Sequence, residues 1–425
     1  MTQSLRSRIE QAVRRGKDWL LTNQITAATP SYDVKEWNAD RTAARWKDEP
    51  VPAHLFGAYY ANLFRNDPWA TKPGEIRRDY HNTWHTAQAG VALLEYLDFE
   101  DDPAVRNSLE MAWAFLDAHQ VKDGPYRGVY VEVPPEELSD VLTMDFSHGH
   151  KSASAAHCYS CYDNIETDLL GLERFRRTGD KASLQAAIDN ADFYLRRHPE
   201  IVFLEVETHN VSISGMCNDA IYGQLAELTG ESRFAEAYER QIQRLSELGL
   251  DLRADNNIRN MYWDATAVLY AVRSYPKLFG PAMAKLSFLA EHTLWAQKDS
   301  GVLWFRFVRP GEPDRARSEH QDGAATYAMI RVWGEMYNQT GDGRWLTAIR
   351  RAVMYALDHQ YGSEYGEGFA NAFEYAGVVA DGHGSEMLRD ISTIFALRAL
   401  LPLLAKKERW AVDFWKQGKS VSNES

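Results

Sequence analysis

The sequence predicts an all-α protein whose helices pair into hairpins that close into one ring. Two kinds of helix alternate along the 425-residue chain, with six of each kind. Similar short turns lead from the second kind of helix to the first, and longer loops make the opposite connection. No Pro- or Ser-rich linker divides the chain, so we expect a single domain over residues 1–425.

The first kind of helix has one apolar stripe and one charged face, and is therefore expected on the outside of the ring. An example is "SRFAEAYERQIQRLSEL", where apolar residues recur every three or four positions. The six segments are 5–24, 105–120, 181–199, 232–248, 279–297 and 343–360. Four of them end in glutamine, at Gln24, Gln120, Gln297 and Gln360.

The second kind of helix begins with polar or aromatic residues and is then apolar on most sides, as in "HQDGAATYAMIRVWGEMY". This pattern is typical of helices that are buried on both faces, so we expect them to line the inside of the ring. The six segments are 81–97, 161–175, 217–228, 262–272, 320–337 and 382–404.

The connections between the helices also repeat. Inner helices lead to outer ones through "RTGD" at 177–180, "LTGE" at 228–231 and "QTGD" at 339–342. Each of these turns supplies a glycine where one helix ends and an acidic residue where the next begins. Outer helices lead to inner ones through longer loops with aromatic, strand-like stretches such as "KDSGVLWFRF". All the long loops should therefore emerge on one face of the ring.

Composition and charge limit the partners. The formal net charge of −13 argues against nucleic acid or an anionic membrane as the main partner, since neither would be steered toward an acidic surface. No stretch approaches the roughly 18 apolar residues of a membrane span, and the charged start is not a signal peptide. The three cysteines cannot form a disulfide framework, so we expect a reduced, cytoplasmic protein. The 13 Trp and 21 Tyr suit a pocket that stacks on flat ligand faces.

The whole-chain pattern resembles the (α/α)6 toroids of carbohydrate-active enzymes. The segment "CYDNIETDLLGLERFRRTGD" is similar to unsaturated glucuronyl hydrolases, whose catalytic aspartate lies near the start of such an inner helix. The matching position is Asp163. The Trp-rich "RGQ" motif of that family is absent, so the resemblance does not extend to its substrate. The N-acylglucosamine 2-epimerase group is similar in length and in its ring of helices.

Acidic residues lie near the starts of five of the six inner helices, which would meet at one mouth of the ring. Paired aspartates suit glycosidic bond cleavage, in which one acid protonates the leaving oxygen and the other activates water or attacks the sugar. An aspartate near a helix start is also a common cap, so each has a structural interpretation. The predicted catalytic residues are Asp163, Asp219, Asp322 and His320. The predicted substrate-binding residues are His81, His148, His150, His209, Tyr262, Trp263, Asp264, Arg306 and His383.

The favoured function is hydrolysis of a small or uronate-containing saccharide, with no cofactor. The histidines and tyrosines support a second chemistry, in which a proton is taken next to a carbonyl or at C5 of a uronate. That chemistry belongs to a sugar epimerase, an isomerase or a polysaccharide lyase. A third interpretation is a helical-repeat scaffold that binds without catalysis. Stereochemical outcome and oligomeric state stay open.

The segment "SHGHKSASAAHCYSCYDN" at 147–164 contains three histidines and two cysteines. Zinc sites use two cysteine pairs or one cysteine pair with a histidine pair, and here there is a single cysteine pair. Cys158 and Cys161 lie three positions apart where a helix begins, and free cysteines are common in tightly packed helix interfaces. We therefore expect no metal, and we expect His148 and His150 at the rim of the pocket.

Overall fold

The computed structural model describes residues 4–38, 43–65, 76–79, 81–145, 156–205, 216–248, 258–304, 321–360, 386–405 and 407–417. The chain divides into two compact units. The first unit consists of Met1–His81, Ala92–Leu109 and Leu294–Ser425, and the second of Asn82–Val91 and Glu110–Thr293. The expectation of a single domain over residues 1–425 stays a prediction.

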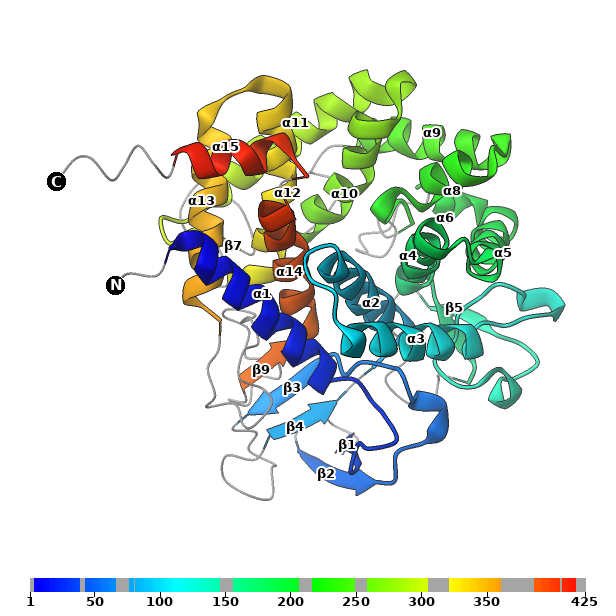
Figure 1. Ribbon diagram of the computed structural model, residues 1–425. Coiled ribbons are helices and arrows are strands. Elements are labelled where there is room, and N and C mark those ends of the chain that lie inside the picture. The colour runs from blue at the N-terminus through cyan, green and yellow to red at the C-terminus, as the bar shows by residue number, and fades with distance from the viewer. Residues whose placement is uncertain are drawn as a thin grey trace. The chain divides into compact units, whose positions relative to one another are not determined.

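The second unit consists mainly of paired helices (Figure 1). Its helices are α4 (Cys161–Thr178), α5 (Lys181–Arg197), α6 (Pro199–Val202), α8 (Ile221–Thr229), α9 (Ser232–Glu247) and α10 (Ile258–Ser274). Helices α2 (Thr83–Leu97), α3 (Pro103–Ala118) and α11 (Phe279–Ala296) contribute residues to both units. Helix α4 packs on α5 and α8, and α9 packs on α8 and α10. The smaller elements are η2 (Gly124–Tyr126), η3 (Pro135–Glu137), η4 (Asn218–Ala220), η6 (Pro276–Leu278) and the parallel strands β5 (Thr143–Asp145) and β6 (Cys158–Ser160).

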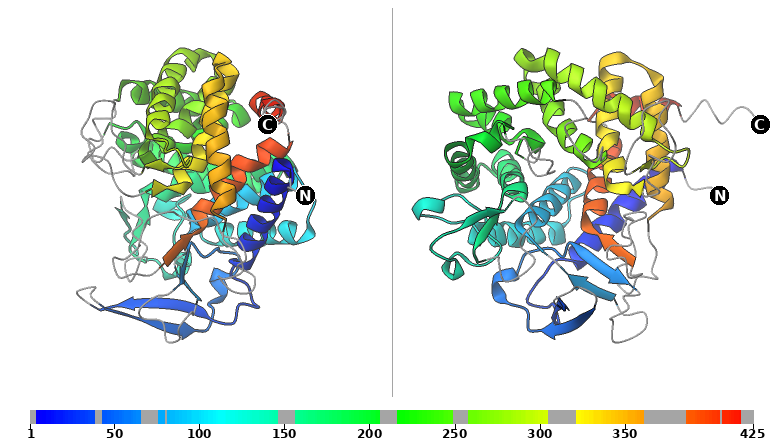
Figure 2. Two further views of the ribbon diagram at one scale, coloured as in Figure 1. Left: turned by 90° about the vertical axis from the view of Figure 1, so that its left-hand side faces the viewer. Right: turned by 180° about the vertical axis from the view of Figure 1, so that it is seen from behind.

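The first unit combines helices with short antiparallel strands (Figures 1 and 2). Its helices are α1 (Leu5–Thr22), η1 (Ala53–Leu55), α12 (Gly323–Thr340), α13 (Gly343–Asp358), α14 (Asp390–Ala405) and α15 (Arg409–Gln417). Helix α12 packs on α13 and α14, and α14 also packs on α1. One two-stranded ribbon pairs β1 (Tyr32–Trp37) with β2 (Ala44–Glu49), and another pairs β7 (Leu303–Trp304) with β8 (Gln321–Asp322). A three-stranded sheet has the order β4 (Ile76–Asp79), β3 (Asn62–Arg65), β9 (Glu386–Arg389).

Burial separates the two kinds of helix as the sequence predicts. Helix α14 is buried at every position except Pro402 and Ala405, which are partly exposed. Helix α9 instead buries one stripe, at Phe234, Ala237, Tyr238, Gln241, Ile242 and Leu245. The inner and outer roles assigned from sequence are therefore confirmed for these helices. Among the described residues, no helix has the length and apolarity that crossing a membrane requires.

The short turns between inner and outer helices have the expected geometry. Gly179, Gly230 and Gly341 adopt left-handed backbone conformations with φ of 73°, 73° and 70°, which glycine adopts at little cost. Asp180 accepts a hydrogen bond from the backbone N–H of Ala182 at 3.0 Å and thereby caps α5. In the same way, Asp342 caps α13 through the N–H of Arg344 at 3.0 Å.

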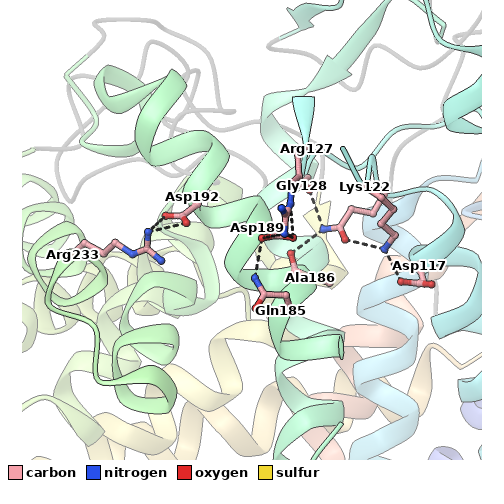
Figure 3. Close-up of polar contacts among 10 residues, drawn as sticks. Asp117, Lys122, Arg127, Gly128, Gln185, Ala186, Asp189, Asp192 and Arg233 are labelled. Atoms are coloured by element: carbon pink, nitrogen blue, oxygen red, sulfur yellow. Dashed lines mark hydrogen bonds and ion pairs between the residues drawn. The ribbon is translucent and has the colours of Figure 1, made fainter. Parts of the chain in front are cut away.

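A repeated glutamine contact joins consecutive outer helices. The side-chain amide of Gln120, at the end of α3, donates to the carbonyl oxygens of Gly128 at 3.0 Å and Ala186 of α5 at 2.8 Å. Figure 3 shows Gly128 and Ala186 close together, beside the ion pair of Arg127 with Asp189. The equivalent acceptors are Gly57 and Ser108 for Gln24, Gly301 and Ala348 for Gln297, and Ala12 for Gln360.

Glycine is required where each of two loops meets the next outer helix. Gly128 has φ of 99°, and a Cβ atom there would lie 2.2 Å from the carbonyl oxygen of Asp189. Gly301 also has φ of 99°, and a Cβ atom there would lie 2.1 Å from the carbonyl oxygen of Arg351. A side chain at either position would therefore push the loop away from the helix.

The entry to α8 differs from the prediction. The sequence predicts one continuous inner helix over 217–228, whereas the structure has the 3-10 turn η4 followed by α8 from Ile221. Asp219 (φ 50°, ψ 12°) and Ala220 (φ 54°, ψ 40°) both have left-handed backbone conformations there. The sequence carries no signal of this break, because neither residue is glycine.

Candidate active site

Polar side chains from α2, α4, η4 and α10 are hydrogen-bonded to one another within the second unit. We call them the acid–amide cluster. Its members are Trp84 and Gln88 of α2, Glu166 of α4, Asn218 and Asp219 of η4, and Thr266 of α10. The cluster contains one of the predicted catalytic residues, Asp219, and its other members are not among the predicted site residues.

Glu166 is the central member of the cluster. Its side chain lies on α4 and the residue is fully buried, with 0% of its surface exposed. One carboxylate oxygen, Oε2, accepts hydrogen bonds from Trp84 Nε1 and, at 3.1 Å, from Gln88 Nε2. The other oxygen, Oε1, accepts from Asn218 Nδ2. Three N–H donors from two other elements therefore satisfy a carboxylate that has no access to water.

Asp219 is the partly exposed carboxylate of the cluster. Its backbone N–H donates to Asn218 Oδ1 at 2.9 Å and to Thr266 Oγ1 at 3.2 Å. Its carboxylate Oδ2 accepts from Gln88 Nε2 at 3.4 Å. A residue other than glycine in such a left-handed conformation costs about 1–3 kcal/mol, so these contacts must maintain it against relaxation. Strain of this kind, held by surrounding groups, is typical of functional sites.

The start of α2 is fixed by two further contacts. Asn82 Oδ1 accepts from the backbone N–H of His85 at 2.6 Å, which is the geometry of a helix cap. Glu132 accepts from the backbone N–H of Thr83 at 3.3 Å and from its hydroxyl at 3.1 Å. An acidic side chain at this end of the helix also interacts favourably with the helix dipole. These contacts fix the helix that carries Trp84 and Gln88.

Asp264 has a different environment from the one expected. Helix α10 begins at Ile258, earlier than predicted, so Asp264 lies in its second turn and not at its start. Its carboxylate lies 3.6 Å from Lys285 Nζ of α11, and both side chains are 4% exposed. A buried ion pair between neighbouring helices favours a structural role for Asp264.

Two more buried carboxyl groups lie on inner helices. Burial raises the pKa of Asp168, two residues after Glu166 in α4, well above its usual range, and the neighbouring Tyr130 partly opposes this shift. Burial likewise raises the pKa of Asp390, the first residue of α14 in the first unit, with Arg389 opposing. Both groups are therefore kept neutral over a wider pH range than an exposed aspartate.

His81 belongs to the first unit and is half-buried. A hydrogen bond of 2.9 Å joins its Nδ1 to the hydroxyl of Tyr32, and the two rings meet edge to face at 5.6 Å. Tyr32 also stacks on Tyr60 with ring centroids 6.0 Å apart. An imidazole and a phenol in contact are the two groups that the proton-transfer prediction requires.

Several predicted site residues are described only by their backbone position. Asp163 lies in the first turn of α4, Tyr262 and Trp263 lie in α10, and Asp322 ends β8 directly before α12. The other predicted residues lie outside the described residues. These are His148, His150, His209, Arg306, His320 and His383.

The cysteine-rich segment is described from residue 156 onward. Cys158 is partly exposed and Cys217 is buried. Within the described part of the chain, no group of three or more His, Cys, Asp or Glu residues has the arrangement of a metal site. The predicted rim residues His148 and His150 are not among the residues described.

The sequence does contain a signal for Glu166, although the predicted site omits this residue. Asn164, Glu166, Thr167 and Asp168 are polar yet completely or almost completely buried in an otherwise apolar inner helix. Polar residues at such positions need hydrogen-bond partners from neighbouring elements. A short polar run inside an apolar helix therefore indicates an internal polar network.

No family model matches the sequence, and no curated protein matches it. Solved structures, in contrast, match over most of the chain. The GH76 α-mannanase of Bacteroides thetaiotaomicron has a TM-score of 0.56 at 13% identity, covering 94% of this chain and 96% of the mannanase. The unsaturated glucuronyl hydrolase of Bacillus sp. GL1, responsible for degradation of glycosaminoglycan, has a TM-score of 0.54 at 13% identity, with coverages of 94% and 97%. A sugar epimerase from a ruminal bacterium has a TM-score of 0.54 at 10% identity, with coverages of 94% and 99%.

These likenesses concern the fold, since the identities are too low to transfer a reaction. The predicted resemblance to (α/α)6 toroid carbohydrate-active enzymes is confirmed at that level. The chain has the all-α (α/α)6 fold that its alternating helices predict.

Proposed function

We propose that this protein is a carbohydrate-active enzyme that hydrolyses a glycosidic bond, with Asp219 as one of its catalytic carboxylates. The observation that carries the proposal is the setting of Asp219. It is partly exposed, it lies on a left-handed backbone, and side chains from α2 and α10 hold it at the start of an inner helix. The likeness to a mannanase and a glucuronyl hydrolase supports a saccharide as the substrate.

Glycosidic bond cleavage needs a second carboxyl group, since one group acts as acid and the other as base or nucleophile. Asp163 is our candidate for this partner. Its position in α4 is three residues before Glu166, and positions three apart share one face of a helix. Asp163 and the buried Glu166 would thus belong to the side of α4 that carries the acid–amide cluster. Asp322 and His320, directly before α12, are the further candidates.

The test is to incubate the protein with a panel of neutral and uronate-containing oligosaccharides and to measure new reducing ends. We expect Asp219→Asn to lower kcat roughly 100- to 10,000-fold, the range that acid–base catalysis contributes. The fold should persist, because asparagine tolerates a left-handed backbone conformation better than most residues. Asp163→Asn should have a similar effect.

The matched control is Asp180→Asn on the outer helix α5, where asparagine can replace aspartate as the cap. Its activity should equal that of the unmodified protein. Normal turnover by a folded Asp219→Asn variant would show that Asp219 is a structural residue, and the hydrolase assignment would lose its main support.

The contact of His81 with Tyr32 favours a second candidate function, a sugar epimerase or isomerase. Here the imidazole would remove a proton next to a carbonyl and the phenol would supply one. The likeness to a sugar epimerase is compatible with this chemistry. Such an enzyme would incorporate deuterium from heavy water into a monosaccharide without releasing new reducing ends. Nuclear magnetic resonance of the sugar measures the incorporation, and its absence across the panel would remove this candidate.

A further inference from the structure

We infer that Glu166 is a positioning residue for Asp219, holding the strained turn at the entry to α8 in the conformation that presents the Asp219 carboxylate. The inference rests on the proposed role of Asp219 as a catalytic group. It adds a residue that acts behind the site, since Glu166 is completely buried while Asp219 is partly exposed. Two separate hydrogen-bonded routes connect the Glu166 carboxylate to Asp219, one to its backbone and one to its side chain.

The first route passes through Asn218. Its Nδ2 donates to Glu166 Oε1, and its Oδ1 accepts from the backbone N–H of Asp219 at 2.9 Å. The same Oδ1 also accepts from the hydroxyl of Thr266. A carboxylate can only accept hydrogen bonds, so Glu166 determines which side of the Asn218 amide faces it. The oxygen side is thereby left to hold the backbone of Asp219.

The second route passes through Gln88. Its Nε2 carries two N–H groups, which reach Glu166 Oε2 at 3.1 Å and Asp219 Oδ2 at 3.4 Å. Glu166 therefore orients the amide that contacts the Asp219 carboxylate itself. One buried group thus fixes both the backbone and the side chain of Asp219.

Glu166 is itself fixed by Trp84. The indole N–H of Trp84 donates to Oε2, and Trp84 is 1% exposed. Because no water reaches this region, nothing can replace a lost acceptor. In Glu166→Gln the new amide group would face the N–H groups of Trp84, Gln88 and Asn218, and at least one amide would have to rotate. Either rotation moves an acceptor or donor away from Asp219.

The experiment compares Glu166→Gln with Glu335→Gln. Glu335 is a matched control, because it is also a buried glutamate of an inner helix, is 4% exposed, and accepts an amide hydrogen bond from Gln339 at 2.8 Å.

Two quantities are measured for each variant: amide hydrogen exchange of the segment 217–221, and kcat and KM on an oligosaccharide that the unmodified protein cleaves. We expect Glu166→Gln to accelerate exchange in 217–221 and to lower kcat roughly 10- to 100-fold, as a misplaced catalytic group does. KM should change less than about twofold, because Glu166 is completely buried and would not touch a substrate. Glu335→Gln should leave both quantities unchanged.

A folded Glu166→Gln variant with normal exchange in 217–221 and normal kcat would overturn the inference. If Glu166→Gln does not fold, Thr266→Val decides, since it keeps the side-chain shape and removes the hydroxyl that bonds Asn218 and Asp219. Faster exchange and a lower kcat in Thr266→Val would support the role of the network, and normal values would overturn it. If the unmodified protein cleaves no oligosaccharide, the proposed function fails, while the exchange measurement still tests whether Glu166 holds the turn.

Discussion

At the scale of single residues, burial is the main cause of the raised pKa of two inner-helix aspartates, Asp168 and Asp390. Asp168 is fully buried in α4, and desolvation is the main cause of its raised pKa. Asp180 at the start of the outer helix α5 shows the opposite case, because its hydrogen bond from Arg174 lowers its pKa. The same residue type is thus held neutral over a wider pH range in an inner helix and held charged at the start of an outer one.

These opposite shifts predict opposite effects of pH on stability. The folded state keeps the Asp168 proton at pH values where the unfolded chain, with a pKa near 3.9, releases it. The stability that this proton provides is present below the unfolded pKa and is lost as the pH rises toward the folded pKa. Asp168→Asn removes the titrating group, so we expect this variant to gain stability relative to the unmodified protein as the pH rises above the unfolded pKa. Urea denaturation at several pH values measures the difference.

Asp180→Asn is the control with the opposite sign. Its folded pKa is lowered, so its contribution is present above the unfolded pKa and is lost as the pH falls through the folded pKa. Asp180→Asn should therefore be less stable than the unmodified protein near neutral pH, and the difference should disappear in acid. A stability of Asp168→Asn that follows the unmodified protein at every pH would show that folding does not raise the pKa of Asp168.

At the scale of helices and turns, the sequence predicts what depends on periodic burial and misses what depends on contacts between distant segments. The predicted segment 161–175 matches α4, because its apolar residues have helical spacing. The start of α10 at Ile258 is not predicted, because the polar residues before Met261 do not continue the apolar pattern. The three-stranded sheet of β4, β3 and β9 is not predicted either, because it pairs segments more than 300 residues apart, such as Asn62 with Arg389.

The candidate site is predictable to a similar extent. The recurrence of acids at inner-helix starts singles out Asp219, and the structure places it in a polar cluster. Glu166 escapes the same reasoning, although its carboxylate accepts hydrogen bonds from Trp84, Gln88 and Asn218, since it lies in the second turn of α4 and not at its start. The left-handed turn at Asp219 and Ala220 has no sequence signal, because the surrounding contacts and not the residue types impose it.

At the scale of the whole molecule, the repeated glutamine contact also joins the last outer helix of the sequence to the first. In the first unit, the amide of Gln360 at the end of α13 donates to the carbonyl oxygen of Ala12 in α1 at 2.9 Å. This bond is equivalent to those by which Gln24, Gln120 and Gln297 join consecutive outer helices. Sequence alone shows the four glutamines but not their acceptors, which lie up to 348 positions away.

Removing the contact of Gln360 with Ala12 should lower the stability of the protein by a defined amount. Gln360→Met keeps the length of the side chain but removes the donor, which leaves the carbonyl of the buried Ala12 without this partner. Ala12 lies inside α1, so its carbonyl keeps its helical partner. We therefore expect the free energy of unfolding to fall by about 0.5–1.5 kcal/mol, the net contribution of one hydrogen bond. Urea denaturation followed by tryptophan fluorescence measures this loss of stability.

The matched control is Gln185→Met, since Gln185 is exposed on α5 and bonds only a side chain, that of Asp189, among its described contacts. That change should alter stability by less than about 0.5 kcal/mol. Equal stabilities of the two variants would show that the amide of Gln360 contributes nothing measurable to the packing of α13 on α1.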